Sequence, residues 1–173
     1  MGAVELNTSP SIQTQPKKSC MKVTDFLRPE MVIAHLEASS KAQVLREMSD
    51  HVAANQAGVE AARLRKVLED RELLASTAIG DGIAIPHGKL ESVPSLIGVL
   101  GRSPAGLEFD SIDGKPTHLI FMLVAPLNSA GVHLKALARL SRLFRDAMFR
   151  QRLLEATDAA AMYDVICEED AKY

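Results

Sequence analysis

Residues 71–90 read RELLASTAIGDGIAIPHGKL, and this stretch decides both the fold and the site of the chain. It begins like the end of a helix and continues through the polar pair Ser76 and Thr77. Residues 83–85 are apolar and lie between glycine and proline, which predicts a short buried strand. His87 follows, held between a proline and a glycine, and its position marks it as a candidate reactive group.

The residue types around His87 point to phosphate chemistry. The proline before the histidine fixes the approach of the chain, and the glycine after it leaves space above the ring. Imidazole is nucleophilic and partly neutral near physiological pH, so it can accept a phosphoryl group. Ser76 and Thr77 can donate hydrogen bonds to phosphate oxygens, and Arg71 and Lys89 supply cations. From these residues alone, a simple structural turn with a half-buried histidine remains an alternative.

Composition excludes several other classes of protein. The 173 residues fit one domain, and a hydrophobic fraction of 47% is enough for a sizeable core. No apolar run of about eighteen residues occurs, so we expect no direct membrane insertion. The net charge of −2, the 4% of aromatic residues and the absence of Trp give no support for a nucleic-acid partner.

The cysteines and histidines indicate no metal site and no cofactor. Cys20 and Cys167 lie near opposite ends of the chain, which fits neither a disulfide framework nor a metal knuckle and suits a reducing cytoplasm. The five histidines are scattered, and the carboxylates lack ligand spacing. We therefore expect a cytoplasmic protein that works without a bound metal.

The N-terminal segment differs in composition from the rest. Residues 1–20 are rich in Ser, Thr, Gln and Pro and contain no apolar signal region, which predicts a disordered extension. Residues 21–168 are predicted to form one domain, and the acidic residues 168–170 are expected to fray.

Hydrophobic periodicity predicts helices that precede, flank and follow one group of strands in this domain. Helices are expected over residues 24–27, 40–55, 59–74, 132–147, 149–155 and 157–166, and strands over residues 31–36, 83–85, 95–101, 107–109 and 118–125. Asp113-Gly114 predicts a hairpin turn, and the long apolar run that follows predicts a central strand buried on both faces. The expected fold class is therefore α/β, with one small mixed β-sheet sandwiched by helices.

Two segments resemble a known family. Residues 71–90 are similar to the active-site signature of bacterial phosphotransferase-system enzyme IIA components of the mannitol/fructose type, and most of all to the nitrogen-regulatory branch, IIA-Ntr. Residues 131–144, GVHLKALARLSRLF, resemble the second histidine region of that family. The similarity extends in order and spacing from about Met21 to Ile166.

The resemblance implies a role for each matched residue. His87 matches the histidine that is phosphorylated on Nε2, and His133 matches a second histidine that lies beside it and helps to hold the phosphoryl group. Arg71 matches an active-site arginine, and Ser76 and Thr77 match the Ser-Thr pair of the site. The implied donor is a small phosphohistidine carrier resembling HPr, or NPr in this branch. The implied fold, a mixed sheet between helices, agrees with the periodicity.

Several positions need separate comment, and some keep more than one interpretation. His133 begins a predicted helix, where N–H groups favour an anion, but its position alone also suits a capping or packing histidine. Lys135, Arg139 and Arg142 line another side of that helix and are expected to be solvated, with docking of an acidic partner as the alternative. Ala75 stands where the family commonly has glycine, which alters the loop but removes no reacting group.

Two functions follow from the resemblance. The first is a regulatory phosphocarrier, rather than a turnover enzyme, that receives phosphate on His87 and controls partners such as sensor kinases or potassium-transport proteins. The alternative is the IIA component of fructose or mannitol uptake, which passes phosphate to a IIB protein. A binding module that has lost phosphotransfer is a third possibility.

Overall fold

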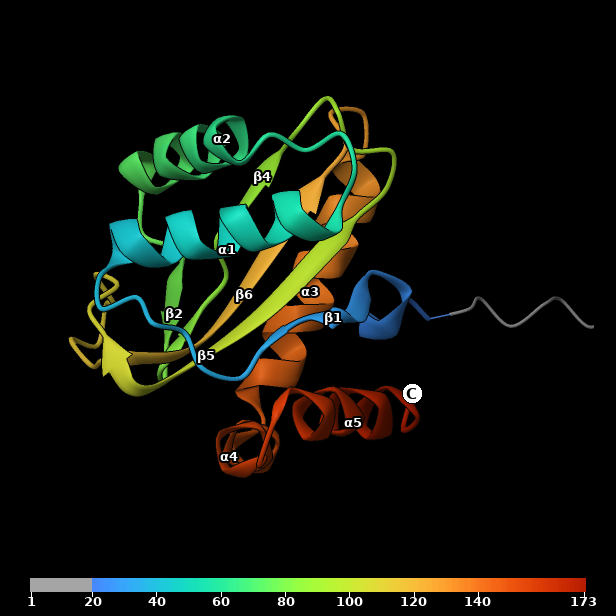
Figure 1. Cartoon of the computed structure of the whole chain (residues 1–173). Helices are drawn as coiled ribbons and strands as arrows, with labels where there is room; N and C mark the ends of the chain where they lie inside the picture. The colour runs from blue at the N-terminus through green and yellow to red at the C-terminus, as the bar shows by residue number, and fades with distance from the viewer. Residues whose placement is uncertain (1–19) are drawn as a thin grey trace, which may run out of the picture.

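The computed structural model describes residues 20–173, in which a group of five consecutive strands is preceded by a first strand and two helices and followed by three helices (Figure 1). The strands are β1 (Leu27–Ile33), β2 (Ala78–Gly80), β3 (Ile83–Ala84), β4 (His87–Lys89), β5 (Ile97–Leu107) and β6 (Thr117–Ala125). The helices are the 3₁₀ turn η1 (Val23–Asp25), α1 (Lys41–Asn55), α2 (Ala61–Leu74), α3 (Ala130–Arg145), α4 (Ala147–Glu155) and α5 (Ala159–Asp170).

The sheet is built around β6, which is buried along almost its whole length. β5 pairs antiparallel with one edge of β6, and β1 continues the sheet parallel to β5. β3 and β4 occupy successive parts of the other edge, both parallel to β6, and β2 pairs antiparallel with β3. The result is a mixed six-stranded sheet in which β3 and β4 behave as one strand interrupted between Ala84 and His87.

Helices cover both faces of this sheet. Figure 1 shows α1 and α2 on the near face and α3 on the far face. Phe144 of α3 packs edge-on against Phe121 of β6, with ring centroids 6.3 Å apart. On the opposite face α2 lies directly on β4: a Cβ at Gly88 would come within 2.7 Å of Val67 Cγ1. The predicted sandwich is therefore confirmed, and the glycine after His87 serves the close approach of a helix.

Most of the predicted elements are present, with shifted ends. The predicted 95–101 strand continues to Leu107, since residues 105–106 form a bulge within β5 instead of ending it. Asp113 and Gly114 lie in the turn between the antiparallel strands β5 and β6, as predicted. The predicted 31–36 strand instead begins at Leu27 and contains Pro29, which an edge strand tolerates.

Both ends of the domain differ from expectation. The predicted helical turn at residues 24–27 was wrong in place, because η1 spans Val23–Asp25 and Leu27 already belongs to β1. The predicted 1–20 extension lies outside the described residues except for Cys20. No helix within residues 20–173 is long and apolar enough to cross a membrane.

The expected fraying of residues 168–170 was also wrong. α5 continues to Asp170, beyond the predicted end of the domain, and Asp170 is almost fully buried. Its carboxylate accepts hydrogen bonds from the backbone N–H groups of Val23 and Thr24 and pairs with Arg139 at 3.0 Å. The acidic residue therefore ties the first turn, α3 and α5 together.

Replacing Asp170 with Asn should strongly destabilise the protein. The change leaves Arg139 as a buried charge without its counter-ion, which typically costs about 3–5 kcal/mol. Glu168→Gln is the matched control, because that carboxylate is exposed and its pair with Arg152 should contribute less than about 1 kcal/mol. Urea unfolding of both variants measures the difference. Equal losses of unfolding free energy would show that Asp170 does not hold the junction.

Candidate phosphoryl-acceptor site

His87 lies where the interrupted strand resumes. The Pro86 carbonyl still pairs with β6, since it accepts a hydrogen bond from the N–H of Leu123 at 2.9 Å. The Ile85 carbonyl instead accepts from Nδ1 of His87 at 2.8 Å. A carbonyl can only accept, so Nδ1 carries the proton and Nε2 keeps its lone pair. The backbone therefore fixes the tautomer in which Nε2 is the nucleophile.

His133 lies beside His87, although the two are far apart in the sequence. It occupies the first turn of α3, with only 8% of its surface exposed. The two imidazole centroids are 5.5 Å apart, and the ring planes meet at 69°. Nε2 of His133 is buried and has no hydrogen-bond partner among the described residues. A buried polar atom without a partner is costly, and it is suited to bind a group that arrives at its neighbour.

The start of α3 adds further donors to this place. Ser129 is the N-cap residue, yet its hydroxyl donates to the Pro126 carbonyl at 2.5 Å and caps no N–H of the helix. The first-turn N–H groups therefore lack a side-chain acceptor. Together with the helix dipole they favour a negatively charged group near His133.

The surroundings of both histidines favour the neutral form. The pKa of His87 is lowered, chiefly by burial and further by the charge of Arg71. The Ile85 carbonyl and the charge of Glu72 oppose this decrease in the pKa only in part. Burial also lowers the pKa of His133, and the nearby charges of His87 and Lys89 lower it further. Neutral imidazoles at neutral pH suit a nucleophile and a hydrogen-bonding neighbour.

Each of the two predicted cations lowers the pKa of one histidine: Arg71 that of His87, and Lys89 that of His133. Arg71 lies in the last turn of α2, where one guanidinium nitrogen donates to the Ala75 carbonyl at 3.0 Å. Lys89 is two residues after His87 on β4, and side chains two apart on a strand share a face. Because Gly88 faces α2, His87 and Lys89 point to the face that carries α3. Arg71 and Lys89 thus approach from different elements.

The predicted phosphate-binding hydroxyls are already engaged. Ser76 donates to the Phe109 carbonyl at 2.8 Å, and Thr77 donates to the carboxylate of Glu72. Donation to a phosphoryl oxygen would need a change of partner in each case. The role of Ser76 and Thr77 in binding phosphate stays a prediction.

Glu72 is the functional neighbour that the sequence did not reveal. Its side chain is 6% exposed, and it binds Thr77 and the ammonium of Lys41 at 2.8 Å. Its charge offsets part of the decrease in the pKa of His87, so a carboxylate acts on this ring as well as the cations. An acidic residue next to Arg71 on a charged helix face gives no sequence signal for this contact.

The other histidines lie apart from the pair. The rings of His51 and His118 bind the backbone carbonyls of Glu30 and Ser103, and His35 is exposed. Within residues 20–173, no three His, Cys, Asp or Glu side chains gather in a group that could hold a metal ion. The chemistry of the site therefore rests on the two imidazoles and the charges around them.

Comparison with known proteins agrees with this geometry. Residues 25–169 match the family described as "Phosphoenolpyruvate-dependent sugar phosphotransferase system, EIIA 2". The chain belongs to this family. It is 40% identical over 146 residues to a nitrogen regulatory protein of Bradyrhizobium diazoefficiens, across 84% of this chain and 95% of that relative. The family resemblance inferred from residues 71–90 and 131–144 is thereby confirmed.

Two further relatives place this IIA protein within the family. A crystal structure of IIA-Ntr from Neisseria meningitidis superposes with a TM-score of 0.77 at 30% identity, covering 82% of this chain and 97% of that chain. The fructose-specific EIIABC component of Bacillus subtilis is 37% identical over 152 residues, which are 87% of this chain but 24% of that protein. The chain is thus similar to nearly whole nitrogen regulatory proteins and to one part of a larger sugar-specific protein.

Both histidines should titrate below the ordinary histidine pKa of about 6.5. The contribution of the neutral rings to stability is then complete above that pH and is lost as the pH falls through the folded-state pKa values. NMR titration of the ring signals measures both pKa values, and ¹⁵N shifts report the proton on Nδ1 of His87.

Two variants separate the causes of these shifts. Arg71→Met should raise the pKa of His87, and Lys89→Met should raise that of His133, because each removes one neighbouring positive charge. Each variant serves as the control for the other. A His87 ring protonated on Nε2, or pKa values above 6.5, would contradict the arrangement.

Proposed function

We propose that this protein is a regulatory phosphocarrier: Nε2 of His87 accepts a phosphoryl group from a phosphohistidine carrier resembling HPr or NPr, and the phosphorylation state selects the partners it binds. The observation that carries the proposal is the imidazole pair. The hydrogen bond to the Ile85 carbonyl leaves Nε2 of His87 as the nucleophilic nitrogen. The ring of His133 lies 5.5 Å away, centroid to centroid, and its buried Nε2 has no partner within residues 20–173.

The transfer step is a displacement at phosphorus. The lone pair of His87 Nε2 forms the new N–P bond while the N–P bond of the donor's phosphohistidine breaks, and that electron pair returns to the donor ring. The proton on Nδ1 of His87 stays on its hydrogen bond to Ile85 throughout. Such transfer requires little covalent chemistry from the protein, so positioning and charge stabilisation carry the catalysis.

Several groups can stabilise the phosphoryl oxygens. His133 would donate from Nε2, and the uncapped N–H groups at the start of α3 would face the same charge. Arg71 and Lys89 supply positive charge, and Ser76 and Thr77 could add donors after changing partners. The protein needs no metal in this scheme.

Two observations support a regulatory role: the similarity to nitrogen regulatory proteins, and exposed apolar residues next to Arg71 and His133 in the chain. Leu73 and Leu74 end α2 next to Arg71, and Val132 and Leu134 flank His133 on α3; all four are exposed. We call these four residues the apolar collar and propose that a partner docks on them. A phosphoryl group on His87 would add charge and acceptor oxygens near this docking surface, and this would change partner choice. Sensor kinases or potassium-transport proteins in the cytoplasm are the partners we propose, by similarity to nitrogen regulatory proteins.

Incubation with phosphoenolpyruvate, enzyme I and the carrier should add one phosphate to the wild-type protein and none to His87→Ala. His133→Ala should still be modified, but about 100-fold more slowly, the usual cost of losing one transition-state donor. Intact mass spectrometry over time measures both. His35→Ala is the matched control, because His35 is exposed and lies apart from the pair. Equal labelling of wild type and His87→Ala would reject the assignment.

The apolar collar should determine affinity for the carrier. Leu134→Asp places a charge beside His133 and should raise the KM for the phosphorylated carrier about tenfold with little change in kcat. Met148→Asp is the control, since Met148 is also exposed but lies on α4, beyond the far end of α3, which is about 17 Å along the helix from Leu134. An equal rise in KM for both variants would indicate general electrostatic repulsion instead of a docking collar.

A sugar-uptake role is the second candidate, favoured by the similarity to the fructose-specific EIIABC component. The same phosphorylated His87 would then pass its phosphate to a IIB protein. Rapid transfer of labelled phosphate to a IIB protein would favour uptake, and a phosphorylation-dependent pull-down of a regulatory partner without such transfer would favour regulation.

A further inference from the structure

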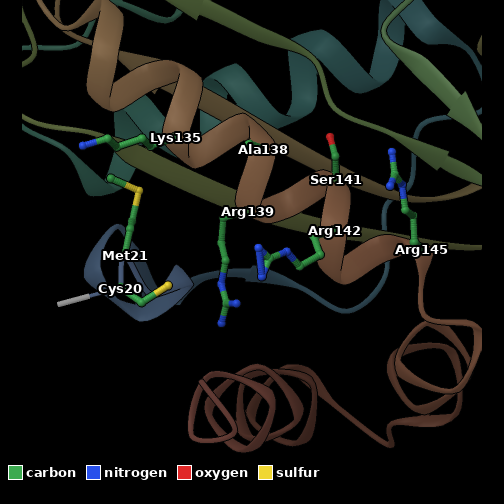
Figure 2. Close-up of a pocket in the computed structure, with 8 residues that line it drawn as sticks. All are labelled: Cys20, Met21, Lys135, Ala138, Arg139, Ser141, Arg142 and Arg145. Atoms are coloured by element: carbon green, nitrogen blue, oxygen red, sulfur yellow. The ribbon is translucent and has the colours of Figure 1, made fainter. Parts of the chain in front are cut away.

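A groove of about 690 Å³ lies along α3, and neither His87 nor His133 is among the residues that line it (Figure 2). Cys20 and Met21, which lead into η1, form one wall, and the exposed side of α3 forms the other. Its size is within the usual range of about 300–1,000 Å³ for pockets that bind small molecules.

Positive charge dominates this groove. Lys135, Arg139 and Arg142 recur at i, i+4 and i+7, so they lie on one face of α3. Figure 2 shows Arg139 and Arg142 extending toward the η1 side, while Arg145 at the far end points away. The groove is lined by no carboxylate among the described residues. Like charges at this spacing destabilise a helix unless something offsets them.

Arg139 departs most from the expectation of a solvated face, which was wrong for this residue. Its side chain is only 5% exposed, and one nitrogen, Nη2, pairs with Asp170. Asp170 already accepts two backbone N–H groups, and Nε and Nη1 of Arg139 have no partner within residues 20–173. The half-exposed ring of Tyr173 lies 4.7 Å from the guanidinium carbon. A buried guanidinium with unused donors is costly unless an acceptor reaches it.

We infer that this groove binds a small organic polyphosphate, such as a nucleoside or sugar di- or triphosphate. The three cations span about 10 Å of helix, more than one phosphate can bridge, so linked phosphates fit them best. Arg139 and Arg142 offer planar forks suited to phosphate oxygens. Met21 on one wall and Ala138 on the other provide apolar surface for the organic part of the ligand.

The groove is separate from the phosphoryl-acceptor site, although both use α3. Arg139 lies about 9 Å along the helix axis from His133, and no residue of the imidazole pair lines the groove. Binding there can therefore be measured independently of phosphorylation on His87.

Inorganic triphosphate is the probe for the charged part of this ligand. Added to the ¹⁵N-labelled full chain at low salt, it should give saturable NMR shifts in residues 20–24 and 135–142. Lys135→Gln with Arg142→Gln should weaken binding at least about tenfold, because two exposed cations of the groove are removed. Arg63→Gln with Lys66→Gln, on the exposed side of α2, is the control with the same change of charge and should alter affinity less than about twofold.

The affinities for orthophosphate and for ATP, each compared with that for triphosphate, test which ligand the groove prefers. Orthophosphate should bind at least about tenfold more weakly than triphosphate. ATP should bind at least as tightly as triphosphate, because Met21 and Ala138 offer apolar surface to its organic part. The inference is overturned by shifts confined to the surroundings of His87, by the absence of saturation, or by equal weakening in both double variants. Saturable binding of an oligoglutamate peptide without binding of triphosphate would overturn it in favour of an acidic protein partner.

Discussion

The hydrogen bond from His87 Nδ1 to the Ile85 carbonyl is the constraint on which the site depends. It determines which ring nitrogen is nucleophilic and in which direction the ring faces. The bond exists because Pro86 interrupts the pairing with β6. The Ile85 carbonyl is thereby turned away from the ladder and toward the ring of His87. A regular strand at this position would use that carbonyl for the sheet and leave the tautomer of the ring unset.

The sheet converts this local feature into a site. β6 carries the interrupted strand along its edge, and the chain after β6 turns directly into α3, which returns His133 to the same place. α2 brings Arg71 and Glu72 from the other direction and approaches closely because residue 88 has no side chain. Three segments that are distant in sequence thus meet around one imidazole, and each is fixed by packing that serves the core as well.

The sequence predicted what local chemistry and periodicity determine. His87 and the buried strand before it follow from residues adjacent in the chain, and the sandwich of helices follows from apolar spacing. The contact between His87 and His133 followed only from family resemblance, because no local signal joins residues so far apart. The engagement of Thr77 by Glu72, and the burial of Arg139 against Asp170, were missed for the same reason. From sequence alone, a charged side chain on a helix is predicted to be solvated, because the tertiary contacts that bury it lie elsewhere in the chain.

The mixed charge around His87 suits a carrier better than a uniformly positive site would. A phosphoryl acceptor that bound its group as tightly as possible could not hand it on. Interactions that stabilise the bound phosphoryl group as much as the transition state do not lower the barrier to transfer. In the proposed transfer Arg71 and Lys89 would attract the phosphoryl group, whereas the charge of Glu72, which is held by Lys41 and Thr77, offsets part of the decrease in the pKa of His87. That carboxylate would repel the bound phosphoryl group and also limit how far the cations depress the basicity of Nε2. Such a balance would keep the ring nucleophilic enough to accept phosphate and the product labile enough to release it.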